Sequence, residues 1–336
     1  MSRPKVFVAR RIPDAGLAPI AAACDVDVWP ERLPPSAEVL RQRAADCDGL
    51  VSLLTDRVDA ALLEAAPRLK VVSNFAVGFN NVDVPACTAR GVCVGNTPGV
   101  LTDATADIAV TLLLAAARRL GESATDAREG RWITWEPLGW LGQDLGGRTL
   151  GIVGMGRIGF AAARRLHHGW GMKVLYTARA DKADANEQLG ATRVELDELL
   201  AASDFVSVHA DLNPSTKGLF GAAQFAKMKR TAVFVNTSRG PLVDQVALAV
   251  ALRNGTIFAA GLDVTDPEPL PADHELFKLP NCVIAPHIAS ATVETRDAMA
   301  RLCANNLLAG IKGEPLPHWV NPDARARKCL SPSKRQ

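Results

Sequence analysis

Three side chains that could transfer protons and bind a carboxylate follow three expected strands in the second half of the chain. Arg239 comes after Val-Phe-Val-Asn, Glu268 lies in the loop after Gly-Leu-Asp-Val, and His287 comes after Val-Ile-Ala. Strands that alternate with helices form parallel sheets, and the loops at the carboxyl ends of such strands border one crevice. We therefore expect the guanidinium, the carboxylate and the imidazole to face the same site.

Together these groups suit the reduction of a 2-oxo acid. Arg239 can hold a carboxylate with its planar fork of donors and polarise the adjacent carbonyl. His287 can give a proton to the carbonyl oxygen as hydride reaches the carbon, and Glu268 can orient the imidazole through its other ring nitrogen. Each residue alone has an ordinary explanation, as a solvated arginine, an acidic turn or a structural histidine. Their joint occurrence behind a nucleotide-binding motif favours the catalytic interpretation.

That motif is G-x-G-x-x-G, formed by Gly154, Gly156 and Gly159. Apolar runs predict a strand before it, and a helix and a second strand after it, which is the context that a dinucleotide fingerprint needs. Gly154 allows the tight turn, Gly156 lets the backbone approach a pyrophosphate, and Gly159 lets the helix pack on the strand. The helix N-terminus offers free N–H groups to the phosphates, so Arg157 and Ile158 join the glycines as predicted cofactor contacts.

The end of the second strand favours NADP(H) over NAD(H). An NAD site usually has an acid about 20 residues after the glycines, but this strand ends in Thr177, Ala178 and Arg179. Thr177 can donate a hydrogen bond to a phosphate oxygen, and Arg179 can pair with a 2′-phosphate. Asp181 argues against this preference for NADP(H), because NAD(H) would be favoured if the loop turned this acid inward.

The first part of the chain also alternates strands and helices, from residue 5 to residue 73, without a glycine motif of its own. We expect a small doubly wound unit there. Two of its strand-end loops, residues 53–56 and 75–81, stand where ligands bind in such sheets. The second loop can aim successive backbone N–H groups at an anion, although a surface turn is its ordinary explanation.

Residues 102–120 predict a long helix that is apolar on most faces and ends at Gly121. Such a helix is buried, either where two domains join or at a subunit interface. The irregular segment 132–147 follows, and it is either a packed surface loop or an arm that covers a neighbour. It carries three tryptophans, Trp132, Trp135 and Trp140.

The composition predicts a globular protein of about two domains. The chain has 336 residues, 48% of them hydrophobic, and a formal net charge of +2, so nothing global indicates nucleic acid or a membrane surface as a partner. We find neither an apolar run that could span a bilayer nor a signal peptide. Seven scattered cysteines without a C-x-x-C pair predict reduced thiols in a cytoplasmic protein, with no metal site.

Four ordered motifs, GMGRIG, NTSRGPLVD, GLDVTDPEPL and APHIAS, resemble those of the D-2-hydroxyacid dehydrogenases. Within that family the chain is most similar to the glyoxylate/hydroxypyruvate reductases, over nearly all of residues 3–320. The resemblance implies an α/β fold with two doubly wound parallel-sheet domains, a cleft between them, and a homodimer. A Rossmann cofactor domain at 102–287 would be inserted into a flavodoxin-like substrate domain at 1–101 and 288–320. The end of the chain is basic and lacks periodicity, which predicts a disordered tail at 321–336.

The resemblance also gives roles to single residues. Arg239, Glu268 and His287 take the catalytic positions, and Arg239 also binds the substrate. Further substrate positions are Leu53, which lines the pocket, and Val77 and Gly78, whose backbone binds the substrate carboxylate. Further cofactor positions are Thr105, His209, Asn213, Thr237, Ser238, Asp263 and Ala289.

Two further features come from the resemblance. Trp140 corresponds to an aromatic residue that a partner subunit contributes. The family often has Pro-Leu-Thr after the histidine at a strand end, whereas this chain has Ala210-Asp211-Leu212-Asn213, which places an extra acid near the pyrophosphate.

The implied reaction is reduction of glyoxylate or hydroxypyruvate to the D-2-hydroxy acid. Oxidation of phosphite, formate or another small anion is an alternative on the same scaffold. A third interpretation, from a different class, is a nucleotide-sensing scaffold similar to the transcriptional corepressors that resemble this family. The balanced charge argues against that scaffold, and a turnover assay would distinguish the classes.

Overall fold

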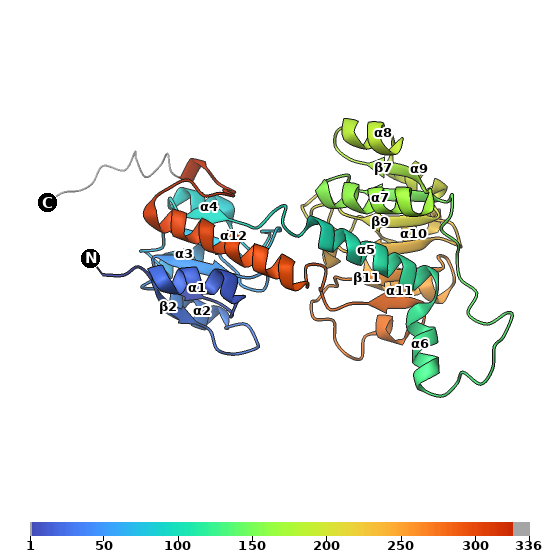
Figure 1. The fold of residues 1–336 in the computed structure, drawn as a ribbon, viewed down its shortest axis with the longest axis horizontal. Helices are drawn as coiled ribbons and strands as arrows, with labels where there is room; N and C mark the ends of the chain where they lie inside the picture. The colour runs from blue at the N-terminus through green and yellow to red at the C-terminus, as the bar shows by residue number, and fades with distance from the viewer. Residues whose placement is uncertain (1, 325–336) are drawn as a thin grey trace. The chain divides into compact units, whose positions relative to one another are not determined.

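The computed structural model describes residues 2–324, and the chain divides into two compact units (Figure 1). One unit consists of residues 1–101 together with 291–336, and the other of residues 102–290. Asn321, the first residue of the predicted tail, is buried, and its side chain bonds the backbone of Val94 and Val92. Ala324 of that predicted tail is also buried, and residues 325–336 lie outside the described residues.

The first unit is built on a parallel sheet with the strand order β2-β1-β3-β4-β5, the flavodoxin-like order. Its strands are β1 (Lys5–Val8), β2 (Asp25–Val28), β3 (Gly49–Ser52), β4 (Val71–Asn74) and β5 (Cys93–Gly95). Its helices are α1 (Asp14–Ala23), α2 (Ala37–Ala44), α3 (Ala60–Ala65), α4 (Val84–Ala89) and α12 (Val293–Lys312). The chain returns through α12, which packs on α1, β3 and β4, so this unit is completed by residues from both parts of the sequence.

The second unit is built on a parallel sheet with the order β12-β11-β10-β9-β6-β7-β8. Its strands are β6 (Thr149–Val153), β7 (Lys173–Thr177), β8 (Thr192–Arg193), β9 (Phe205–Val208), β10 (Val233–Asn236), β11 (Ala259–Leu262) and β12 (Cys282–Ile284). Its helices are α5 (Thr102–Ala117), α6 (Leu120–Arg128), α7 (Arg157–Trp170), α8 (Ala183–Leu189), α9 (Leu196–Ala202), α10 (Ala222–Lys227) and α11 (Gln245–Arg253), with short 3-10 helices η1 (Gly240–Leu242) and η2 (Glu275–Lys278). Strand order reverses between β6 and β9, the switch point at which Rossmann folds bind dinucleotides. The predicted fold class, two doubly wound parallel-sheet domains, is confirmed.

The expectation of one helix over residues 102–120 is wrong. α5 ends at Ala117, Arg119 has a left-handed backbone with φ of 53°, and the chain then turns into α6. The carbonyl of Ala117 accepts a hydrogen bond from the N–H of Gln143, farther along the chain. This carbonyl therefore has a partner although the helix does not continue. Gly121 therefore lies in the first turn of α6, where it does not end a helix.

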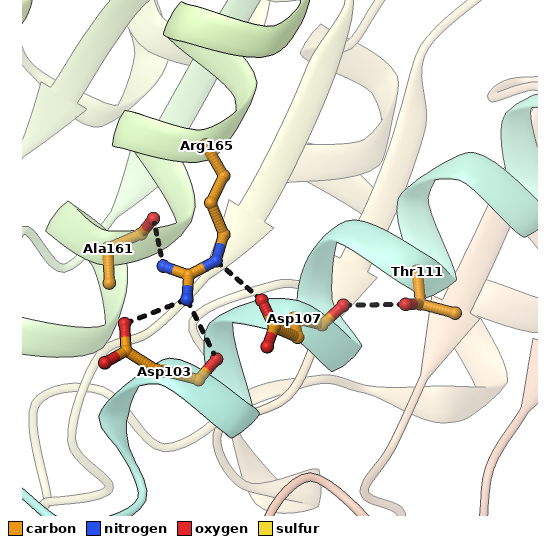
Figure 2. A network of polar contacts seen from close by, with 5 residues as sticks. All are labelled: Asp103, Asp107, Thr111, Ala161 and Arg165. Atoms are coloured by element: carbon orange, nitrogen blue, oxygen red, sulfur yellow. Dashed lines mark hydrogen bonds and ion pairs between the residues drawn. The ribbon is translucent and has the colours of Figure 1, made fainter.

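Helices α5 and α7 pack closely and are joined by one arginine (Figure 2). Ala106 and Ala109 of α5 form a buried cluster with Ala161 and Ala162 of α7, and such small side chains let two helices approach. Arg165 of α7 bonds two carboxylates on α5. The contact holds α5 against the helix that begins at the glycine motif.

Arg165 reaches Asp103 Oδ1 at 2.8 Å and Asp107 Oδ1 at 2.6 Å, and it also donates to the carbonyl of Ala161 at 3.0 Å. Both carboxylates are largely exposed, so each pair adds little stability by itself. Because one planar guanidinium serves both acids, the arrangement fixes the register of α5 along α7. Thr105 lies between the two acids and is buried.

Six cysteines among residues 2–324 are free thiols, and Cys329 lies outside the described residues. Over the same residues, every helix is too short or too polar to span a membrane.

Candidate active site

His287 and Glu268 meet at the carboxyl edge of the seven-stranded sheet. His287 follows β12 and Glu268 lies in the loop after β11, and these strands are neighbours. The Nδ1 atom of His287 is hydrogen-bonded to Oε1 of Glu268. The imidazole is about three-quarters buried, with 26% of its side chain exposed. The bond occupies one ring nitrogen and leaves Nε2 for a substrate.

The loop that carries His287 is held by a buried carboxylate. His287 has a left-handed backbone with φ of 54°, which is uncommon for a residue with a side chain. Asp263 accepts the N–H of Ile288 at 2.8 Å and that of Ala289 at 2.9 Å, and its carbonyl accepts the N–H of His287 at 3.0 Å. Burial raises the pKa of Asp263, and the bonds from the two N–H groups oppose that rise. Three hydrogen bonds that Asp263 accepts thus fix the backbone that carries the imidazole.

Arg239 is positioned by Asn236, the last residue of β10. The buried Asn236 accepts the N–H of Ser238 and donates to the carbonyl of Arg239, both at 3.0 Å. Burial lowers the pKa of the Arg239 guanidinium, and the charge of Glu268 opposes this. The guanidinium therefore lies within electrostatic reach of the acid–base pair, and the predicted trio is brought together at one sheet edge.

The loops after β10 and β11 touch each other. A Cβ at Gly240, next to Arg239, would overlap the carbonyl of Thr265. Gln245, the first residue of α11, accepts the N–H of Asp266 at 3.1 Å and donates to the carbonyl of the same residue. An amide that accepts from the N–H and donates to the carbonyl of one residue fixes the loop two residues before Glu268. Sequence reasoning did not single out Gln245, Asn236 or the loop-holding role of Asp263.

The glycine turn has the form that a pyrophosphate requires. A Cβ at Gly154 would lie 2.6 Å from the N atom of Ala210, and a Cβ at Gly159 would overlap the carbonyl of Gly154. Gly156, the N-cap of α7, faces open space, and no side chain caps the helix. The residues present therefore fit a dinucleotide, with the first N–H groups of α7, from Arg157 onward, available to its phosphates.

Further predicted cofactor residues follow β9 and β10 at the same carboxyl edge. The hydroxyl of Thr237 is buried and has no hydrogen-bond partner among residues 2–324, a donor that a ligand could satisfy. Ser238 donates to the carbonyl of Ala210, which joins the loops after β9 and β10. His209 lies 2.9 Å from the hydroxyl of Ser207, and burial lowers its pKa to about 4. His209 is therefore neutral at physiological pH.

Asn213 bonds within its own turn. Its Oδ1 accepts the N–H of Ser215 at 2.9 Å and the hydroxyl of the same residue at 2.6 Å. At the end of β7, Thr177 and Ala178 are half-buried and Arg179 is exposed. The contacts of these residues with a cofactor remain predictions.

Two asparagines arrange the predicted carboxylate-binding loop in the five-stranded unit. Asn74 donates to the carbonyl of Gly78 at 2.9 Å, and Asn96 donates to the carbonyl of Val77 at 2.8 Å. Within residues 2–324, the N–H groups of Val77 and Gly78 make no hydrogen bond. Two adjacent donors whose carbonyls are bonded elsewhere have the arrangement that a turn needs to bind an anion, and the carboxylate contact itself remains a prediction. Neither asparagine stood out in the sequence, because a single amide after a strand has no distinctive spacing.

Leu53 lies in the neighbouring loop and is held by polar groups. Its N–H donates to the buried Asp56 at 2.7 Å, and its carbonyl accepts from Asn81 at 2.9 Å. Asn81 also bonds Asn74 at 3.2 Å, so the two strand-end loops form one network. Burial raises the pKa of the Asp56 carboxyl, and the hydrogen bond from the N–H of Leu53 opposes that rise. The loop that carries Leu53 is thus fixed to the loop that carries Val77 and Gly78.

The segment between α6 and β6 carries an exposed aromatic cluster. In Figure 1 this green segment runs outward from the seven-stranded unit before it returns. Trp132 is 73% exposed and Trp135 is 80% exposed. Trp140 has φ of 53°, and its ring lies under the guanidinium of Arg119 at 5.2 Å. The segment 129–145 is hereafter called the arm.

Comparisons with known proteins agree with this geometry. Residues 110–289 match the family model of the D-isomer specific 2-hydroxyacid dehydrogenase NAD binding domain. The chain is 52% identical over 322 residues to the glyoxylate reductase of Korarchaeum cryptofilum, covering 96% of this chain and 97% of that protein. It is 48% identical over 316 residues to the human glyoxylate reductase/hydroxypyruvate reductase, covering 93% and 96%.

A solved structure has the same fold. It is the NADPH-dependent glyoxylate/hydroxypyruvate reductase of Sinorhizobium meliloti in complex with NADP and malonate. The sequences are 34% identical, the TM-score is 0.85, and the match covers 96% of this chain and 98% of that one.

Two glycine substitutions should separate folding from cofactor binding. Gly159→Ala should lower the free energy of unfolding by about 1–3 kcal/mol, because its Cβ would overlap the carbonyl of Gly154. Gly156→Ala has room for its Cβ and an ordinary φ of −86°, so it should lower stability by at most about 1 kcal/mol, the loss expected when alanine replaces a preferred N-cap residue. It should nevertheless weaken NADPH binding at least tenfold, because the methyl group occupies the approach of the pyrophosphate. Urea unfolding and calorimetric Kd values measure both effects, and an unchanged Kd for Gly156→Ala would contradict the cofactor assignment.

Proposed function

The chain belongs to the D-isomer specific 2-hydroxyacid dehydrogenases, a family of NAD(P)-dependent enzymes, and we propose that it reduces glyoxylate or hydroxypyruvate with NADPH. The products would be glycolate and D-glycerate. The observation that carries this proposal is the contact between His287 and Glu268 at the sheet edge where the glycine turn lies. The names of the relatives support the choice of these two substrates.

The residues of this chain would divide the reaction among them. Bound NADPH supplies the hydride. Arg239 binds the substrate carboxylate and polarises the carbonyl. His287 holds a proton at Nε2 and gives it to the carbonyl oxygen, while Glu268 at Nδ1 keeps the ring oriented. Negative charge that develops on the oxygen is therefore met by a proton donor and a guanidinium.

We keep Val77, Gly78 and Leu53 as predicted substrate residues. The unpaired N–H groups of Val77 and Gly78 support a carboxylate contact, because the two asparagines leave these donors for an anion. The reductase of Sinorhizobium meliloti was crystallised with malonate, which is also a small carboxylate. Leu53 contributes an apolar wall, in keeping with a substrate that has a small side chain.

NADP(H) remains the preferred cofactor in this proposal. Arg179 is exposed at the end of β7, where it can pair with a 2′-phosphate. No acid stands among Thr177, Ala178 and Arg179. The related Sinorhizobium meliloti enzyme is NADPH-dependent, which supports the same preference here. The cytoplasmic location stays a prediction from the cysteine pattern.

A turnover panel tests the proposed reaction. Glyoxylate, hydroxypyruvate and pyruvate are supplied with NADPH or NADH, and phosphite and formate are supplied with the oxidised cofactors. We expect the highest kcat/KM with glyoxylate or hydroxypyruvate and NADPH, followed as loss of absorbance at 340 nm. Turnover of phosphite or formate alone would favour the alternative oxidation. Nucleotide binding without any turnover would favour the sensing scaffold.

We also propose a homodimer in which the arm covers a second copy of the chain. Monomeric proteins rarely expose several large aromatic side chains together, and Trp132 and Trp135 are both more than 70% exposed. Burying two tryptophans in each copy supplies the anchors that stable interfaces use. Trp140 would be the residue that reaches the partner.

Sedimentation equilibrium tests the arm. The wild type should have twice the mass of one chain at micromolar concentration, and Trp132→Ser with Trp135→Ser should weaken the association at least tenfold, because the exposed rings would form the contact. Trp170→Ser is the matched control, since Trp170 is exposed at the end of α7. A monomeric wild type, or an unaffected double variant, would contradict the proposal.

A further inference from the structure

Tyr176, the single tyrosine of the chain, has a fully buried side chain but a hydroxyl with three polar neighbours. It lies on β7, whose carboxyl end carries the predicted 2′-phosphate contact. Its oxygen lies 2.6 Å from Oδ1 of Asp181 and 3.0 Å from Oδ1 of Asn186, and it accepts the N–H of Lys182 at 2.9 Å. A hydroxyl has one proton, and the nearer, charged acceptor is the stronger partner, so Tyr176 donates to Asp181.

Asp181 is held at both of its oxygens. Asn186, on α8, donates to Oδ2 at 2.8 Å, while Tyr176 occupies Oδ1. These two hydrogen bonds lower the pKa of Asp181, with the tyrosine as the larger cause. The carboxylate is therefore charged and directed toward β7 and α8, although the residue itself is exposed.

Asp181 is also the first acid after the end of β7. In Rossmann folds an acid in this region binds the ribose 2′-hydroxyl of NAD(H), and its charge repels the 2′-phosphate of NADP(H). The neighbouring strand β8 adds a positive charge near this loop. Its Arg193 donates to the carbonyl of Ala178 at 3.0 Å. The end of β7 is thus accompanied by two arginines, Arg179 and Arg193, and by Asp181, whose two carboxylate oxygens are already hydrogen-bonded.

We propose that Tyr176 is a specificity-determining residue that holds Asp181 away from the ribose and thereby favours NADP(H). This inference deepens the proposed function and rests on its assignment of the nucleotide site. The phenol does not touch the nucleotide in this scheme. It acts through Asp181, and Asn186 assists at the second oxygen.

The direction of each effect follows from charge. Tyr176→Phe removes the bond to Oδ1 and lets the exposed carboxylate turn toward the ribose. NADPH should then bind more weakly, because a carboxylate approaches its 2′-phosphate, and NADH should bind more tightly, because its 2′-hydroxyl gains an acceptor. Asp181→Asn removes the charge, so the same tyrosine substitution should have little effect in that background.

The experiment is a double-mutant cycle measured by cofactor binding. Calorimetry gives the Kd values of NADPH and NADH for the wild type, Tyr176→Phe, Asp181→Asn and the double variant. We expect Tyr176→Phe to shift the ratio of the two Kd values at least fivefold toward NADH, and the double variant to return within twofold of Asp181→Asn alone. Asn186→Ala should shift the ratio in the same direction as Tyr176→Phe. A shift below twofold for Tyr176→Phe, or one that persists in the double variant, would overturn the inference.

One further readout and the choice of reference keep the result interpretable. Because the chain has one tyrosine, 13C-labelling gives a single Cζ resonance, which should move in Asp181→Asn if the phenol contacts Asp181 in solution. An unmoved resonance would contradict the contact itself. The shift in each variant is scored against the wild type, so it tests Tyr176 whichever cofactor the wild type prefers. A wild type that binds NADH more tightly would instead overturn the cofactor preference given under the proposed function.

Discussion

The proposed chemistry of this chain depends on one contact, the hydrogen bond between Nδ1 of His287 and Glu268. Parallel strands bring the two loops to one edge, but loops of this kind have many conformations, and fixing each residue costs roughly 1–2 kcal/mol in backbone entropy. Side chains that form hydrogen bonds with backbone groups offset this loss of entropy. Asp263 holds the His287 loop, and Gln245 holds the loop before Glu268. The hydrogen bonds to Asp263 hold the backbone of His287 in its left-handed conformation.

A similar arrangement recurs at the other functional loops. Asn236 holds the backbone of Arg239, and Asn74 and Asn96 hold the carbonyls of Gly78 and Val77. In each case a buried amide bonds backbone groups and thereby fixes the loop that carries a predicted substrate contact. Buried polar networks stabilise only when their members are satisfied, so these asparagines are part of the folded core as well as of the site.

The strands and the glycine turn could be predicted from the sequence because each has a local signal, and Arg239, Glu268 and His287 could be placed after β10, β11 and β12 for the same reason. Alternating apolar runs locate β6 and β10–β12, and the three glycines have a fixed spacing. Gln245, Asn236 and Asn74 could not be found this way, since their bonds join backbone groups that no periodic pattern identifies. The break at Arg119 was missed for the same reason, because the chain there turns where a carbonyl of α5 bonds the distant Gln143. Local propensity favoured a longer helix, and this tertiary contact overrode it.

The most direct test of the account is the single-turnover rate of hydride transfer in His287→Gln, with NADPH and glyoxylate both saturating. A positioned proton donor contributes about 10²- to 10⁴-fold to such a rate. The account predicts a loss of that size with an unchanged Kd for NADPH, because His287 is assigned to the substrate oxygen and not to the nucleotide. A rate within tenfold of the wild type would contradict the role of His287 as the proton donor.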